Sequence, residues 1–98
     1  MDRQGTVARF SKAFLTAART SAGVSLTWNP PDNGGADIKD YRVYRSTTPG
    51  GEKMLQKVLG SKTGYVDTTA SAGVNYFYQV TAENKQGQGP RSNEVRSN

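Results

Sequence analysis

Residues 74–84 read VNYFYQVTAEN, and this stretch decides the fold. Successive side chains of a β-strand point to opposite faces, so the stretch divides into two alternating sets. The first set is apolar or aromatic, as a buried face should be, and contains Tyr76, Tyr78, Val80 and Ala82. The second set is polar except for Phe77. Because aromatic and β-branched residues favour strands, we expect residues 74–84 to form a central strand against which the others pack.

Six further short segments show strand patterns of the same kind. They are residues 14–18, 24–28, 38–46, 53–59, 65–68 and 94–96. The clearest is residues 24–28, where Val24, Leu26 and Trp28 alternate with polar residues, which places the single tryptophan in the core. Turn residues separate the segments at intervals of about 8–12 residues, and no helix is required. The pattern predicts one all-β domain, a seven-stranded antiparallel β-sandwich.

Glycine and proline mark the connections between these strands. Residues 29–37 (NPPDNGGAD) are too many for a tight hairpin and predict an arch that joins two different sheets. Residues 48–51 (TPGG) place Pro49 and Gly50 at the two central positions of a type II turn. Residues 84–91 (NKQGQGPR) are expected to form a loop.

The composition excludes several kinds of chemistry. The chain has 98 residues with no cysteine and no histidine, which removes disulfides, thiol catalysis, the commonest zinc ligand and every Ser-His arrangement. The net charge of +5 is concentrated in the first 20 residues, so the folded body is nearly balanced and we expect no nucleic-acid partner. No apolar run is long enough to cross a membrane, and the first residues do not read as a secretory signal. We therefore expect no membrane partner. We also expect the protein to be a monomer.

Acidic residues suggest catalytic or metal-binding roles at only a few places. Asp32 and Asp37 bracket the glycine-rich loop, but their spacing matches no EF-hand-like calcium loop. Asp37 with Asp40, or Glu83 with Glu94, would have to face each other across a cleft to act as glycosidase carboxylates, and a small sandwich offers no obvious cleft. We predict no catalytic residue, no cofactor and no metal, and we expect that the protein is not an enzyme.

Four groups of residues, in order from Leu15 to Val95, resemble a fibronectin type III domain. They are LTA and VSLTW with PP and NGG in residues 15–35, IKDYRVYR in residues 38–45, YVDT in residues 65–68, and YFYQVTAEN with GP and SNEV in residues 76–95. The sequence RSTTPGG in residues 45–51 looks like the bacterial branch of this family. Copies in that branch commonly sit beside catalytic or carbohydrate-binding domains in secreted polysaccharide-degrading enzymes.

The resemblance implies an immunoglobulin-like sandwich in which strands A, B and E form one sheet and strands C, C′, F and G form the other. It makes Tyr76 the expected tyrosine corner, with its hydroxyl bonded to the backbone near residues 70–73. The other residues with an expected structural role are Trp28, Tyr41, Tyr78 and Val80. The resemblance also implies a location outside the cell or at its surface. Residues 13–98 are expected to be the domain, and residues 1–12 a flexible N-terminal segment or a vector-derived remnant.

Two surfaces are candidates for binding a partner. The first is the solvent face of strands C and F, with Arg42, Tyr44, Phe77 and Gln79. Two aromatic rings beside a cation and an amide could stack on a sugar or contact a neighbouring domain, although ordinary cross-strand pairing explains the same residues. The second is the F–G loop, with Lys85, Gln86 and Gln88. This loop carries no Arg-Gly-Asp motif, and a plain connecting loop is the alternative interpretation.

The resemblance implies a non-catalytic spacer or interaction module of a larger, secreted bacterial multidomain protein such as a glycoside hydrolase, with the flanking domains as its partners. One alternative is an adhesion module that binds a polysaccharide or a surface protein through the C–F face or the F–G loop. Another is an engineered binding scaffold in which the loops at residues 29–37 and 85–89 have been varied.

Overall fold

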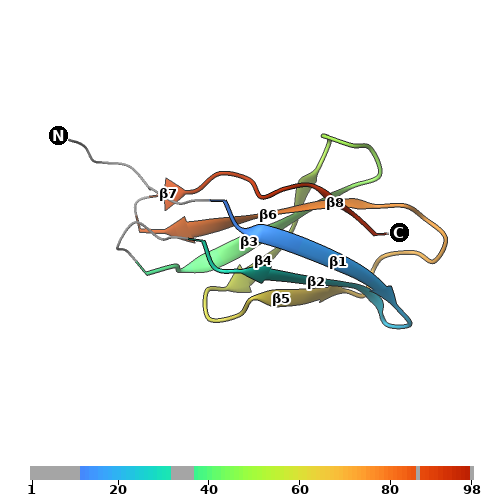
Figure 1. Ribbon diagram of the computed structural model, residues 1–98, viewed down its shortest axis with the longest axis horizontal. Helices are drawn as coiled ribbons and strands as arrows, with labels where there is room; N and C mark the ends of the chain where they lie inside the picture. Colours follow the sequence, from blue (N-terminus) through green and yellow to red (C-terminus); the bar gives the residue numbers. More distant parts are fainter. Residues whose placement is uncertain (1–11, 32–36, 86, 98) are drawn as a thin grey trace.

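The computed structural model describes residues 12–31, 37–85 and 87–97, which form two antiparallel β-sheets packed face to face (Figure 1). The first sheet has the order β1-β2-β5, with β1 at Phe14–Thr20, β2 at Gly23–Asn29 and β5 at Gly64–Asp67. The second has the order β4-β3-β6, with β4 at Lys53–Leu59, β3 at Asp40–Ser46 and β6 at Phe77–Asn84. Two short strands, β7 at Gly87–Gln88 and β8 at Val95–Arg96, pair with the other edge of β6. Among these residues there is no helix long and apolar enough to cross a membrane.

This arrangement confirms the predicted sandwich and its division into an A-B-E sheet and a C-C′-F-G sheet. The structure differs from the prediction in strand G, because the expected loop at residues 84–91 contains β7 and the strand is therefore in two pieces. Pro90 lies between the pieces and has no N–H to give to a ladder. Ser92 keeps the pairing with β6, since its N–H donates to the Val80 carbonyl at 2.9 Å and its hydroxyl accepts from the Val80 N–H at 2.9 Å.

The period-2 alternation places the large side chains of both sheets in one core. Trp28 from β2 packs on Tyr41 from β3, with ring centroids 5.2 Å apart. Tyr78 and Val80 from β6 are completely buried, and Tyr76 is buried just before that strand. All five residues expected to have a structural role therefore lie in the core.

Hydrogen bonds confirm two local predictions. The Ser71 N–H donates to the Tyr76 hydroxyl at 2.9 Å, which is the contact expected of a tyrosine corner. At residues 48–51, the Gly51 N–H donates to the Thr48 carbonyl at 3.0 Å, and Gly50 has a φ of 79°. A positive φ at the third residue is what a type II turn requires, and glycine adopts it without a steric penalty.

The chain enters the sandwich at one end and leaves it at the other. In Figure 1, β1 begins at the left of the long axis, and the segment that follows β8 ends at the right. Asn93 connects this last segment to β1, because its side-chain oxygen accepts from the Leu15 N–H at 2.8 Å and its amide donates to the Leu15 carbonyl at 2.9 Å. The Asn93 amide thus occupies main-chain groups on the outer edge of β1, as a neighbouring strand would.

Candidate interaction surface

The outer face of the β4-β3-β6 sheet holds the four side chains predicted to bind a partner. In the register of β3 with β6, Tyr44 lies opposite Gln79, Arg42 opposite Thr81, and Ser46 opposite Phe77. The structure therefore brings Tyr44 and Gln79 together and places Arg42 and Phe77 on either side of them.

Both aromatic rings of this face are covered, so the expectation of two rings open to solvent is wrong. Tyr44 is 7% exposed and Phe77 is 9% exposed. Arg91 lies over Tyr44, with its guanidinium carbon 4.1 Å from the ring centroid. Gln88 donates to the Tyr44 hydroxyl and, at 2.7 Å, to the Thr81 hydroxyl. The segment after β6 folds back across the face and takes the place that a sugar ring would need.

The polar groups of this face bind one another. Arg91 donates to the side-chain oxygen of Gln79 at 3.1 Å and to the main-chain oxygen of Glu52 at 3.3 Å. The Gln79 amide in turn donates to the Ser92 carbonyl at 3.2 Å. A guanidinium over a tyrosine ring gains cation–π stabilisation in addition to these bonds. The region therefore offers a fixed guanidinium and amides, which suit hydrogen bonding better than ring stacking.

Two acidic groups meet at the other end of the same face. Arg42 forms an ion pair with Glu83, and one guanidinium nitrogen lies 3.1 and 3.0 Å from the two carboxylate oxygens. Asp40 lies opposite Glu83 in the register and is buried. Burial and the neighbouring Glu83 carboxylate raise the pKa of Asp40, while the charges of Lys57 and Arg42 act in the opposite direction.

A second carboxyl pair lies just before β4. Glu52 is buried, and its carboxyl group lies beside that of Glu94, while no other side chain among the described residues hydrogen-bonds to its oxygens. Burial and Glu94 raise the pKa of Glu52. Hydrogen bonds with Glu52 and with the Gly50 N–H, which donates at 2.8 Å, lower the pKa of Glu94. One proton shared by the two carboxyl groups accounts for both directions.

The pairs considered in the sequence were Asp37 with Asp40 and Glu83 with Glu94. In the structure, Asp40 lies beside Glu83 and Glu94 lies beside Glu52. Carboxyl groups in direct contact lack the separation of about 5 Å or more that glycosidase pairs use. Over residues 12–31, 37–85 and 87–97, no three Asp or Glu side chains are grouped so that they could hold a metal ion. Asp37 is exposed, and Asp32 lies outside the described residues.

Sequence reasoning missed a buried polar network around Asp67, the last residue of β5. Its fully buried carboxylate accepts from Arg45 at 2.9 Å, from the Tyr78 hydroxyl at 2.7 Å, and from the N–H and hydroxyl of Thr69 at 3.1 and 2.6 Å. Burial alone would raise the pKa of Asp67, but these hydrogen bonds and the Arg45 charge lower it overall. Burial and the bond to Asp67 raise the pKa of Tyr78. The Arg45 guanidinium also lies 4.8 Å from the Tyr76 ring centroid.

The alternation of β3 contained a signal for this network. Arg45 falls on the same strand face as Tyr41 and Val43, which is the buried face. An arginine that points inward needs a carboxylate partner, because an unpaired buried charge is costly. The YVDT segment supplies that partner at Asp67, but the sequence alone does not place the two strands at the same depth.

The F–G loop presents fewer side chains for binding a partner than predicted. Lys85 is exposed, but the Gln88 amide is engaged by Tyr44 and Thr81. Gln86, the third predicted residue of this loop, lies outside the described residues.

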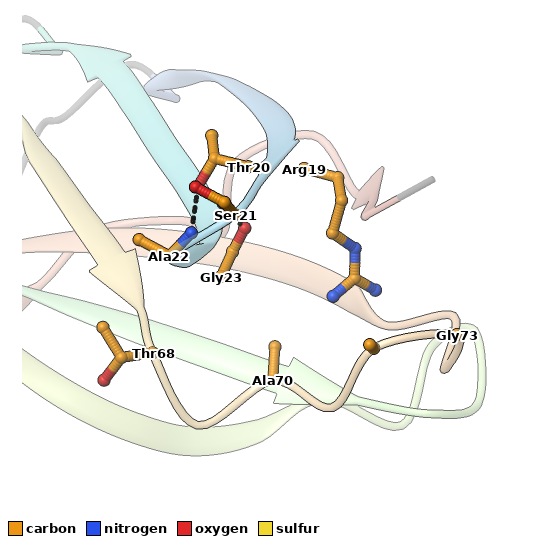
Figure 2. A pocket seen from close by; sticks show the side chains of 9 residues that line it. Arg19, Thr20, Ser21, Ala22, Gly23, Thr68, Ala70 and Gly73 are labelled. Atoms are coloured by element: carbon orange, nitrogen blue, oxygen red, sulfur yellow. Dashed lines mark hydrogen bonds between the residues drawn. The ribbon is translucent and has the colours of Figure 1, made fainter.

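An open hollow lies at one end of the sandwich, between the β1–β2 turn and the segment that follows β5. Figure 2 shows the Arg19 side chain extending towards this segment, where Ala70 and Gly73 line the hollow. Arg19 donates to the Ser71 carbonyl at 3.2 Å and to the Val74 carbonyl at 2.6 Å. Its guanidinium thus fastens the segment to β1, and a ligand would have to displace those bonds.

Comparison with known proteins agrees with this geometry. The family model described as "Fibronectin type III domain" matches residues 13–98. The chain belongs to the fibronectin type III family. The crystal structure of an Fn3-like protein from Clostridium thermocellum superposes with a TM-score of 0.73 and 31% identity, and covers 93% of this chain and 92% of that one.

Two of the relatives that this fibronectin type III domain matches are named as enzymes. An amylopullulanase of Thermoanaerobacterium thermosulfurigenes is 44% identical over 63 residues, which are 63% of this chain and 3% of that protein. Exoglucanase B of Cellulomonas fimi is 38% identical over 78 residues, which are 76% of this chain and 6% of that protein. The chain spans a few per cent of the length of these relatives, so the domain corresponds to one small module within each of them.

Proposed function

We propose that this fibronectin type III domain is a non-catalytic spacer that separates and orients its flanking domains in a larger, secreted polysaccharide-degrading protein of a bacterium. The observation that carries the proposal is that the chain enters and leaves at opposite ends of the sandwich (Figure 1). The seven residues of β1 rise by about 3.3 Å each, so domains attached at the two ends are held apart by roughly 23 Å or more.

The last segment is fastened to both sheets, which supports a fixed direction of exit. Asn93 bonds to the main chain of Leu15 in β1. The Ser97 N–H donates to the Tyr76 carbonyl at 2.8 Å, and the Ser97 hydroxyl accepts from the Tyr76 N–H at 2.8 Å. These hydrogen bonds therefore fix the direction in which residues 93–97 leave the sandwich.

The similarity to short parts of an amylopullulanase and an exoglucanase supports the proposal that this domain is one module of a larger polysaccharide-degrading protein. A non-catalytic role is supported by the acidic side chains, since Asp67 and Glu83 bind arginines and Glu52 contacts another carboxyl group. A location outside the cell belongs to the same proposal.

Two spin labels would test the spacer role. The chain has no cysteine, so Lys12→Cys with Arg96→Cys labels one exposed position near each end. Pulsed electron–electron resonance should give a single narrow distance distribution of roughly 20–25 Å, plus the label arms, unchanged by soluble starch or cellulose oligomers. Thr20→Cys with Arg96→Cys, two exposed positions nearer the same end, is the control and should give a shorter distance. A broad distribution for the first pair would overturn the rigid spacer.

A second candidate function is glycan binding by the outer face of the β4-β3-β6 sheet. The observation that favours it is the guanidinium of Arg91 and the amide of Gln79, which hydrogen-bond to each other at 3.1 Å beside the buried Tyr44 ring. Co-sedimentation with insoluble starch and cellulose separates this role from the spacer. Binding that is lost in Arg91→Ala would support the glycan module, and a domain that stays in the supernatant would support the spacer.

A further inference from the structure

The β4-β3-β6 sheet ends at β4, and no strand of the described chain covers the outer side of this strand. β4 runs over seven residues and pairs with β3. Of its outward-facing carbonyls, that of Lys57 accepts from the Gln56 side-chain amide at 3.0 Å and that of Leu59 accepts from the Lys62 N–H at 3.0 Å.

The other long edge strand, β1, differs because a segment distant in sequence bonds to it, through the Asn93 side chain and the Leu15 main chain, whereas the bonds to the two β4 carbonyls come from β4 itself and from the turn that follows it. β5, the other edge of that sheet, has only four residues. In the part of the chain that the structure describes, β4 is therefore the longest edge strand to whose outer side no distant segment is bonded.

The outer face of β4 carries an alternating row of apolar and basic side chains. In the register with β3, Leu59 lies opposite Asp40, Lys57 opposite Arg42, and Met54 opposite Tyr44 after a bulge. Leu59 is 67% exposed and Met54 is 50% exposed, and they are two of the four large hydrophobic side chains that are exposed in the described ranges. An exposed apolar pair on an open edge strand is an unusual feature of a domain surface.

The charge of this edge is positive. Lys53 and Lys57 are exposed, and β4 itself contains no acidic residue. Arg42, opposite Lys57, has its guanidinium bound by Glu83, and the nearby Asp40 carboxyl is buried. Lysine on an edge strand repels a second copy of the same strand, and two β4 edges joined in this way would bring four lysines together. The charges thus disfavour a second copy and favour an acidic segment.

We propose that the β4 edge accepts one added strand, an extended acidic segment of a partner protein. Main-chain hydrogen bonds to an open edge give affinity in such complexes, and alternate side chains give specificity. Residues directly opposite each other on neighbouring strands interact, so the side chains next to Leu59 and Lys57 should be apolar and acidic respectively. The segment therefore contains the pattern apolar, any residue, acidic, read in either chain direction. This goes beyond the spacer role, and neither proposal depends on the other.

The test uses a probe segment joined to the full chain, because a single short strand binds weakly. The peptide TVTETVT has the required pattern, and TVTKTVT is its matched control. Each is attached after residue 98 through a 30-residue Gly/Ser linker, whose end-to-end distance is about 30 Å. Tethering of this kind gives an effective concentration in the millimolar range, so weak binding is detected.

Amide hydrogen exchange and two-dimensional NMR of the ¹⁵N-labelled fusions provide the readout. With the acidic segment, β4 amide signals should shift, and exchange at the outward-facing amides of β4 should slow at least tenfold relative to the lysine control. Lys57→Glu, at an exposed position, should reverse the preference between the two segments. Equal protection by both segments, shifts confined to other strands, or no shift at all would each overturn the proposal. So would a concentration-dependent dimer through β4, measured by sedimentation velocity of the chain without a probe.

Discussion

Replacing Arg45 by methionine should destabilise the domain by about 2–4 kcal/mol. The guanidinium donates at 2.9 Å to the Asp67 carboxylate, which is completely buried. Removing one partner of a buried ion pair costs about 3–5 kcal/mol, because the other charge is left without compensation. The Arg45 side chain is 25% exposed, and Tyr78 and Thr69 still donate to the carboxylate. These two features place the expected loss towards the lower part of that range.

The assay is urea unfolding at pH 7, followed by the fluorescence of Trp28, the single tryptophan, which is buried in the core. The same measurement on Asp67→Asn and on the double variant completes a double-mutant cycle. In the Asp67→Asn background, Arg45→Met should cost less than about 1 kcal/mol, because no buried negative charge remains unpaired. Arg96→Met, at an exposed position of β8, is the matched control and should change stability by less than about 0.5 kcal/mol.

The pH dependence provides a second check on the same pair. The fold lowers the pKa of Asp67 below its ordinary value of 3.8, so its contribution is fully present above that value and is lost as the pH falls through the lower, folded value. The difference in the free energy of unfolding between the unsubstituted chain and Arg45→Met should therefore decrease below about pH 4. Strictly additive effects in the cycle, or a difference that stays constant from pH 7 to pH 3, would refute the reasoning.

Three further predictions concern single positions. Tyr76→Phe removes the corner hydroxyl and should cost about 0.5–1.5 kcal/mol in a denaturant melt; an unchanged midpoint would contradict the corner. Gly23→Ala should destabilise the domain much more than Gly50→Ala, because a Cβ at Gly23 would overlap a main-chain oxygen at the end of β5 while a Cβ at Gly50 meets open space. Both glycines have a positive φ, so the backbone strain of alanine is present in both variants. Equal decreases in the melting temperature would contradict the steric argument. Glu52→Gln should stabilise the domain at pH 7, because the fold raises the pKa of Glu52 and thus disfavours its charged form. This stabilisation should shrink as the pH falls from the raised pKa of Glu52 towards its ordinary pKa of 4.5. Melts at pH 7 and pH 4.5 measure the change. An effect of the substitution that is equal at both pH values would argue against the shared proton.

Local patterns predicted most of the fold. The alternation in residues 74–84 identified the buried face of β6, and the same pattern placed Trp28 and Tyr41 in the core. The TPGG turn and the tyrosine corner depend on neighbouring residues, so they too were accessible from the sequence. The loop prediction at residues 84–91 was incomplete, because β7 is only two residues long and exists through its pairing with β6.

The candidate site depended on contacts between distant residues, and there the sequence was a poorer guide. Alternation correctly directed Tyr44 away from the core, but Gln88, 44 residues along the chain, bonds to its hydroxyl, and Arg91 covers its ring. The partner of Arg45 lies 22 residues away in the other sheet. The sequence by itself determined which face of each strand is apolar, because that property repeats every two residues along one segment. Only the tertiary structure decided which outward faces are covered and which charges meet, because these depend on the segments that folding brings together.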